Sequence, residues 1–382
     1  MYQGNVLFPE WANKRPLLEE SLSKLIEKIL GKIRWNIKAI FVYGSAATGE
    51  YTSFPNDIDL LVVTHFYDPL LPERIRSVLQ NAPVKIEVDQ ISLADFNTLK
   101  TMQLVDVKNS GVLIYGDKNL QVVSKTHDVY GYEGIKVLFN FGVMKLLRVM
   151  PKSILESSEP STEQKRLIIS GCVKAYEGIC SCLLILKNKY RVGYGARADY
   201  FSKVYEKEYP SLCKEIPHLS QKIKFAYALR KENIRYDGNS VDLWSDTRKD
   251  IESVIPYAMA SFFGETQTSL PRNILMLNTF PHNILSSLIY AFRLFSNEKK
   301  IPPVSIFSLD PASKLFISSA FLLFSFDRRL NFNESFLKIA EQNLASFNPI
   351  HLKETRPIDR WEEMRKVILT LPGIVSQWHM HD

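Results

Sequence analysis

A short apolar run that ends at a glycine-serine pair constrains this chain more than any other feature of its 382 residues. Ile37 to Tyr43 is rich in aliphatic and β-branched residues, and Gly44-Ser45 follows at once. Such a run, stopped by glycine, is typical of a buried strand that ends in a tight turn. After eleven further residues, Asp57-Ile58-Asp59-Leu60 alternates acidic and aliphatic residues, which predicts a second strand continuing to Thr64.

A third strand is predicted from Val84 to Ile91, where apolar and polar residues alternate strictly. In this pattern Glu87 and Asp89 fall on the polar face of the strand. The spacing of aliphatic residues predicts helices over 16–34, over 71–80 and from Leu93 toward Val107. The three strands are therefore expected to form a sheet flanked by helices.

Helical periodicity replaces strand alternation from about Asp117 onward. We therefore predict an α+β fold, in which an N-terminal domain with a small mixed sheet flanked by helices is followed by α-helical domains. The expected domains are residues 1–118, 119–235 and 236–382. Within the second, Ser161 and Gln164 have the spacing of a capping box, which predicts the start of a helix running toward Lys187.

Composition and charge exclude several classes of protein. Hydrophobic residues make up 46% and charged residues 23%, which is ordinary for a folded chain, and the four cysteines lack the C-x-x-C spacing of zinc or redox sites. The start of the chain does not resemble a signal peptide, and the longest apolar run, Leu315 to Phe326, is shorter than the roughly 20 residues that span a bilayer. A cytoplasmic location without membrane contact is expected. The net charge of +7 is scattered along the chain, which makes nucleic acid a less favoured partner than a nucleotide.

The acidic strands and the Gly-Ser turn together suit phosphate chemistry. Residues two apart on a strand point the same way, so Asp57 and Asp59 can share divalent ions, and a third carboxylate from the next strand, Glu87 or Asp89, commonly completes such a site. Magnesium is the expected metal because it prefers hard oxygen ligands. Gly44 lets the backbone approach phosphate oxygens, and the Ser45 hydroxyl can donate a hydrogen bond to them.

The motif Gly44-Ser45, eleven residues, Asp57-Ile58-Asp59 resembles the signature of the DNA polymerase beta-type nucleotidyltransferase superfamily over roughly the first 118 residues. The form of the turn and the short spacing to Glu87 resemble minimal and aminoglycoside-type nucleotidyltransferases, and Ser110 to Gly116 is similar to the segment that closes such domains.

This resemblance implies a role for each residue of the motif. Gly44 and Ser45 would hold the phosphates of the nucleotide, Asp57 and Asp59 would bind two magnesium ions, and Glu87 would be the third ligand or the general base. Glu87 is preferred because aliphatic residues flank it on both sides, as in these families, which leaves Asp89 as a supporting residue.

Two departures from the family pattern concern the turn and the first aspartate. Asn56 stands where many relatives have serine, and Ala46-Ala47-Thr48 stands where several carry arginine. Neither removes a metal ligand, but one phosphate contact is left unassigned. Lys85 or a cation of the helical region could supply it, and Arg197 is the candidate from that region.

The resemblance implies an enzyme that transfers a nucleoside monophosphate from an NTP, with ATP as the expected donor, to a hydroxyl of a small-molecule acceptor, releasing pyrophosphate. The helical domain over 119–235 would form the acceptor side. Two alternatives remain: protein AMPylation, antitoxin-like or self-modifying, and a nucleotide-binding protein without turnover. The intact acidic residues argue against the second alternative.

Overall fold

The computed structural model describes residues 26–27, 30–31, 34–48, 57–68, 71, 74–75, 85–122, 128–156, 159–231, 236–265, 269–279, 311–345, 347 and 356–371. The chain forms two compact units. Unit 1 comprises Met1–Tyr130 and Tyr190–Ala196, and unit 2 comprises Gly131–Lys189 and Arg197–Asp382. The domain boundaries expected at 118 and 235 stay predictions, because residues that pack together need not fold independently.

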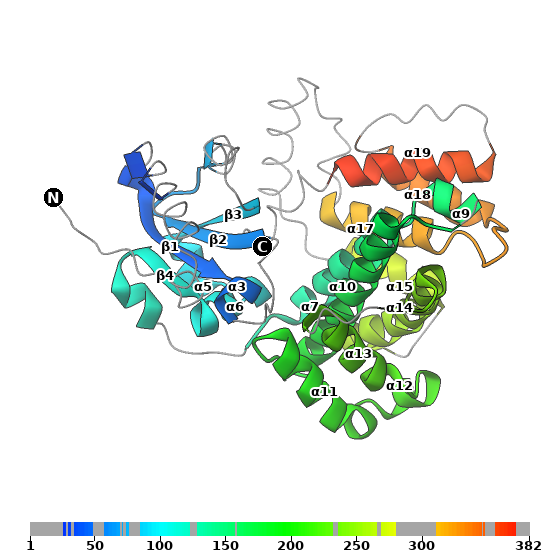
Figure 1. Ribbon diagram of the computed structural model, residues 1–382, viewed down its shortest axis with the longest axis horizontal. Helices are drawn as coiled ribbons and strands as arrows, with labels where there is room; N and C mark the ends of the chain where they lie inside the picture. Colours follow the sequence, from blue (N-terminus) through cyan, green and yellow to red (C-terminus); the bar gives the residue numbers. More distant parts are fainter. Residues whose placement is uncertain are drawn as a thin grey trace. The chain divides into compact units, whose positions relative to one another are not determined.

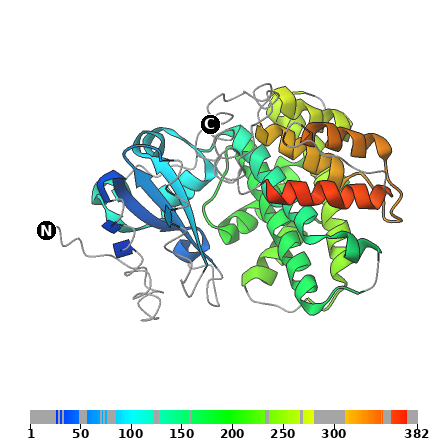
Figure 2. The ribbon, with the colours of Figure 1, turned by 90° about the horizontal axis from the view of Figure 1, so that it is seen from above.

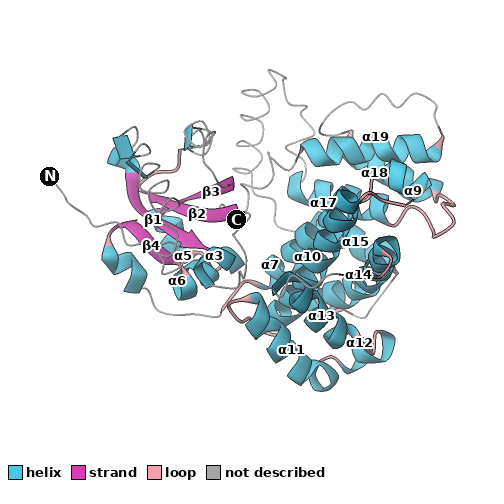
Figure 3. Cartoon of the chain, in the orientation of Figure 1, coloured by secondary structure: helices cyan, strands magenta, loops and turns pink. Residues whose placement is uncertain are grey.

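Unit 1 contains one mixed sheet of four strands, labelled in Figure 1: β1 (Ile37–Tyr43), β2 (Asp57–Thr64), β3 (Lys85–Ser92) and β4 (Val112–Gly116). Their order is β3-β2-β1-β4. β1 is antiparallel to β2 and to β4, whereas β2 and β3 are parallel. In the described residues all four strands, magenta in Figure 3, belong to unit 1, and helices make up unit 2. The predicted α+β fold with a small mixed sheet is confirmed.

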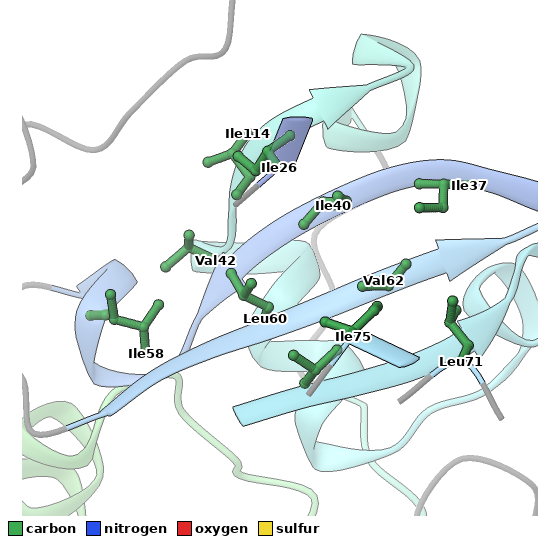
Figure 4. Packing of buried hydrophobic residues seen from close by; sticks show 12 residues of the cluster. Ile26, Ile37, Ile40, Val42, Ile58, Leu60, Val62, Leu71, Ile75 and Ile114 are labelled. Carbon is green, nitrogen blue, oxygen red and sulfur yellow. The ribbon is translucent and has the colours of Figure 1, made fainter. Parts of the chain in front are cut away.

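The two faces of the sheet are both covered. On one face, Ile40, Val42, Leu60 and Val62 belong to a buried cluster, shown in Figure 4, which also includes Leu71. On the other face, the rings of Phe41 and Phe96 stack with centroids 5.6 Å apart. Here helices α5 (Leu93–Thr98) and α6 (Met102–Ser110) pack against the strands. Unit 1 also contains the short elements α3 (Ser45–Thr48), η1 (Arg34–Asn36) and η2 (Lys118–Val122).

The strands predicted over 37–43 and 57–64 are confirmed, and the third ends at Ser92, one residue later than predicted, while its predicted start at Val84 lies outside the described residues. β4 was not predicted as a strand, and one helix prediction is wrong. A single helix was expected from Leu93 toward Val107, and the structure has two. Leu99 is extended, with φ −76° and ψ 149°, and the Thr101 hydroxyl accepts a hydrogen bond from the Leu104 amide at 3.2 Å, which starts α6. The helices predicted over 16–34 and 71–80 lie largely outside the described residues, of which 26, 27, 30 and 31, and 71, 74 and 75, are helical.

The regular elements in the described residues of unit 2 are helices, joined by loops that include an isolated β-bridge between Phe326 and Phe332. Its N-terminal half contains α7 (Gly131–Val137), the π-helix η3 (Leu138–Met144), α8 (Lys145–Val149), α9 (Lys152–Glu156), α10 (Thr162–Leu186), α11 (Tyr194–Glu208), α12 (Pro210–Glu215) and α13 (Leu219–Lys231). The first turn of α11 belongs to unit 1. The remainder contains α14 (Ser240–Phe263), α15 (Leu270–Leu275), η4 (Met276–Thr279), α17 (Pro311–Leu323), α18 (Glu334–Leu344) and α19 (Pro357–Thr370). In Figure 2, α17 and α18 in orange lie beside α19 in red, and the three helices contact one another.

Helix α10 is the central helix of unit 2. It contacts α7, η3, α8, α13 and α14. Its N-terminus has the predicted capping box, in which the Ser161 hydroxyl accepts from the Gln164 amide at 3.2 Å and the Gln164 side chain accepts from the Ser161 amide at 2.7 Å. Among the described helices, only α10 is long and apolar enough to cross a membrane, and 83% of that apolar window is buried, as is usual for a core helix.

Candidate active site

The turn after β1 brings Gly44 against the carboxylate of Asp59. Gly44 has φ +68°, a left-handed conformation that favours glycine. A Cβ atom added there would lie 2.6 Å from Asp59 Oδ2, a distance that real Cβ contacts essentially never show. Ser45 follows as the first residue of α3, and the Gly44 carbonyl accepts from the amides of Ala47 and Thr48, both at 3.1 Å. Glycine is therefore required here for two reasons, the backbone angle and the space that Asp59 occupies.

The strand register places Asp59 between two other polar residues. Asp59 lies opposite Tyr43 of β1 and opposite Glu87 of β3. Neighbouring strands are about 4.8 Å apart, so the side chains of an in-register pair on one face are close neighbours. Glu87 is exposed and Asp59 is half-buried. The sheet thus brings Asp59 and Glu87 together beside the Gly44 turn, as the sequence predicted.

Two candidate residues are described only in their backbone. Asp57 begins β2, two residues before Asp59, and pairs with Lys85 at the start of β3. The side chains of both lie outside the described residues, as does Asn56. Among the described side chains, which do not include that of Asp57, no three or more His, Cys, Asp or Glu residues lie close enough together to hold a metal ion.

Asp89 has different surroundings from Glu87. Its Oδ2 atom accepts a hydrogen bond from the Tyr43 hydroxyl at 2.6 Å and another from Gln103 Nε2 at 2.7 Å. Gln103 lies on α6 and also donates to the Tyr43 hydroxyl oxygen. In the register, Asp89 lies opposite Leu61 and not opposite an acidic residue. Because β2 lies between β1 and β3, the Tyr43–Asp89 hydrogen bond connects the two neighbours of β2 across it.

The surroundings of Tyr43 oppose the ionisation of its phenol. Burial raises the pKa of the Tyr43 phenol well above its ordinary value, and the negative charges of Asp89 and then Asp59 raise it further. The phenol therefore stays protonated and donates to Asp89.

Arg197, the candidate for phosphate binding from the helical region, lies in unit 2 and is 3% exposed. Its Nη2 atom donates to Glu177 Oε1 at 3.1 Å, while Arg230 and Lys174 contact Glu177 Oε2 at 2.7 and 3.1 Å. Burial raises the pKa of Glu177, but the charges of Lys174, Arg230 and Arg197 outweigh burial and lower it to about 2. The observed contacts thus give Arg197 a structural role, and phosphate binding by Arg197 stays a prediction.

The sequence alone did not reveal two residues of this region, Tyr43 and Gln103. A signal for Tyr43 was present, since it is the polar end of an otherwise apolar strand and immediately precedes the Gly-Ser pair. Gln103 had no such signal, because its role depends on the packing of α6 against the sheet. Asp89 was expected to be a supporting residue, and its hydrogen bonds agree with that interpretation.

A small mixed sheet, a Gly-Ser turn after the first strand and acidic residues on the next two strands define a nucleotidyltransferase-type domain. Residues 24–119 match the family described as "Polymerase beta, Nucleotidyltransferase". This segment is therefore a domain of the DNA polymerase beta-type nucleotidyltransferase superfamily, as its motifs indicated. No curated protein matched the chain. The family match supports a nucleotidyltransferase-type function and suggests transferase activity.

Proposed function

We propose that this protein is a magnesium-dependent nucleotidyltransferase that transfers AMP from ATP to a hydroxyl group of a small-molecule acceptor and releases pyrophosphate. The main support is the register of β2 and β3, which sets Asp59 beside Glu87 next to the Gly44 turn in a domain of this superfamily. In the reaction, the acceptor oxygen forms a bond to the α-phosphorus of ATP while the bond to the β-phosphate bridging oxygen breaks. The hydroxyl proton leaves to a base.

The residues present fit the metal that this chemistry requires. Magnesium prefers carboxylate oxygens, and Asp59 and Glu87 offer them from adjacent strands. Gly44 leaves open the space beside Asp59 Oδ2 that any Cβ atom would fill. Asp57, Asp59 and Glu87 would hold the two ions, with Asp57 included on the strength of its position in the motif. When bound, magnesium neutralises phosphate charge and lowers the pKa of an attacking hydroxyl.

The chain itself contributes orientation and a base. The backbone at Gly44 and the hydroxyl of Ser45 would hold the phosphates, because glycine permits close approach and a hydroxyl can donate to a phosphate oxygen. Glu87 is the nearest acid to Asp59 in the register and is exposed, so it can serve as the third ligand or take the acceptor proton.

The experiment combines α-labelled ATP, magnesium and a panel of hydroxylated small molecules that includes aminoglycosides. We expect pyrophosphate release and a labelled acceptor with wild-type protein, and neither with Asp57→Ala or Asp59→Ala. Asp117→Asn is the matched control. Asp117 directly follows Gly116, which pairs with Ala39 near the start of β1, whereas Gly44 follows the end of that strand. The Asp117 carboxylate forms an ion pair with Lys38 at 3.5 Å. This variant should keep wild-type activity.

Intact-mass measurement of the protein after incubation with ATP separates the kinds of acceptor. A mass increase of one AMP on this chain, lost in Asp59→Ala, would point to self-modification in place of transfer to a small molecule. If wild type and Asp59→Ala behave alike with every NTP and acceptor, the proposed transferase activity is wrong.

A further inference from the structure

We propose that Tyr43, Asp89 and Gln103 form a hydrogen-bonded support that positions Asp59 for metal and nucleotide binding, and that Asp89 is a positioning residue and not the third metal ligand. This inference rests on the proposed function, because it assigns a role within the same site.

Asp89 and Glu87, the two acids on the polar face of β3, have different surroundings. One of its oxygens, Oδ2, already accepts from two donors, Tyr43 Oη at 2.6 Å and Gln103 Nε2 at 2.7 Å. Such bonds to a carboxylate are charge-assisted and stronger than bonds between neutral groups. Glu87, by contrast, is exposed and lies directly opposite Asp59 in the parallel register. Of the two acids on β3, Glu87 therefore has the position of a ligand and Asp89 that of an acceptor within the fold.

Tyr43 connects Asp89 with the strand position of Asp59. Tyr43 lies opposite Asp59 in the β1–β2 register, and its hydroxyl reaches Asp89 on β3. The tyrosine side chain therefore crosses β2 on the face that carries Asp59. Tyr43 also immediately precedes Gly44, whose Cα hydrogen points at Asp59 Oδ2 in the space where a Cβ would lie. The network thus holds the residue that lies opposite Asp59 in the register and that is bonded directly to Gly44.

Helix α6 contributes the third residue of the network, Gln103. Gln103 uses its amide to donate both to the Tyr43 hydroxyl oxygen and to Asp89, so each member of the triangle contacts the other two. A closed network of this kind restricts the tyrosine more than a single bond would. Hydrogen-bonded partners of metal ligands orient those ligands, and their loss typically costs about 10- to 100-fold in metal affinity or activity.

The test uses binding of Mn²⁺–ATP, followed by the electron paramagnetic resonance signal of free Mn²⁺, so that it does not depend on knowing the acceptor. We expect Asp59→Asn to abolish binding. Asp89→Ala and Tyr43→Phe should each weaken it by about 10- to 100-fold. Asp89→Asn keeps an acceptor oxygen and should rescue binding to within about tenfold of wild type.

Two further variants sharpen the interpretation. The double variant Tyr43→Phe/Asp89→Ala should lose less binding free energy than the sum of the two single losses, because both changes remove the shared Tyr43–Asp89 hydrogen bond. Tyr115→Phe is the matched control, since Tyr115 on β4 has a hydroxyl that makes no hydrogen bond within the described part of the chain. It should bind like wild type.

The outcomes separate this inference from the proposed function. If wild type binds no Mn²⁺–ATP, the proposed function fails and the positioning role fails with it. If wild type binds and Asp59→Asn does not, the site is supported, and two results overturn only the present inference. Binding by Asp89→Asn as weak as that of Asp59→Asn would make Asp89 a ligand. Unchanged binding by Tyr43→Phe and Asp89→Ala would show that the network supports nothing in the site.

Discussion

Replacing Gly44 by alanine should damage the candidate site through one defined contact. The added Cβ would lie 2.6 Å from Asp59 Oδ2, and Cβ atoms essentially never approach closer than 3.0 Å. The carboxylate must therefore move by at least 0.4 Å (3.0 minus 2.6), or by 0.8 Å to reach the 3.4 Å of an ordinary contact. Catalytic groups must be held to within about 0.5 Å, and a 1 Å misplacement can cost about 100-fold in rate. We expect Gly44→Ala to slow pyrophosphate release from ATP by roughly 10- to 100-fold.

The control for this variant is Gly264→Ala. Gly264 has φ +69°, close to the +68° of Gly44, but a Cβ there would meet nothing within 4 Å. Both alanines bear a left-handed backbone, which costs a residue other than glycine roughly 1–2 kcal/mol. Only Gly44→Ala adds the collision with Asp59. Gly264→Ala should therefore lose stability and keep wild-type activity.

A double-mutant cycle measured on the free energy of unfolding tests the collision without any assay of activity. Asp59→Ala removes the carboxylate, so Gly44→Ala should cost less stability in that background than in wild type. Two results would refute the reasoning: wild-type pyrophosphate release by Gly44→Ala, or strict additivity of the two substitutions in the cycle.

Three further predictions concern unit 2. Glu177→Gln removes the carboxylate that Arg197 donates to in a buried ion pair and should cost about 3–5 kcal/mol in chemical denaturation. Because the pKa of Glu177 is lowered to about 2, its ionised form stabilises the fold fully above the ordinary carboxyl pKa of about 4.3, and this contribution is lost as the pH falls toward 2. The loss of stability over that range should be smaller in Glu177→Gln, and an unchanged acid transition would contradict it. Ser161→Ala removes the N-cap of α10 and should lower the free energy of unfolding by about 1 kcal/mol, whereas a shift within error would mean that the cap contributes nothing. Maleimide should label only Cys213 in the native protein and all four cysteines after denaturation, as counted by mass spectrometry. The other three cysteines are buried, and burial raises the pKa of each of their thiols. Labelling of Cys180 in the native protein would contradict this expectation.

Local patterns in the sequence predicted β1, β2 and β3, but they did not predict β4 and they joined α5 and α6 into one helix. β1 and β2 could be predicted because an apolar run ended by glycine and an alternation of acids with aliphatics are properties of a few adjacent residues. The break between α5 and α6 was missed, since apolar spacing continues across it while Leu99 adopts an extended backbone and Thr101 caps the next helix. Periodicity reports which face is buried, and it does not report where a cap interrupts the helix.

In the candidate site, the alternating sequence pattern also fails to distinguish Glu87 from Asp89. Both acids lie on the polar face of β3, so alternation alone treats them alike. They differ through partners that are distant in sequence: Asp59 lies opposite Glu87, whereas Tyr43 and Gln103 donate to Asp89. Arg197 illustrates the converse, because the sequence made it the candidate cation of the helical region for phosphate binding, while its observed partner, Glu177, comes from another helix. Which charge faces which is set by register and helix packing. For this reason the substitutions at Asp89, together with Gly44→Ala and its clash with Asp59, are the ones that test contacts between residues distant in sequence.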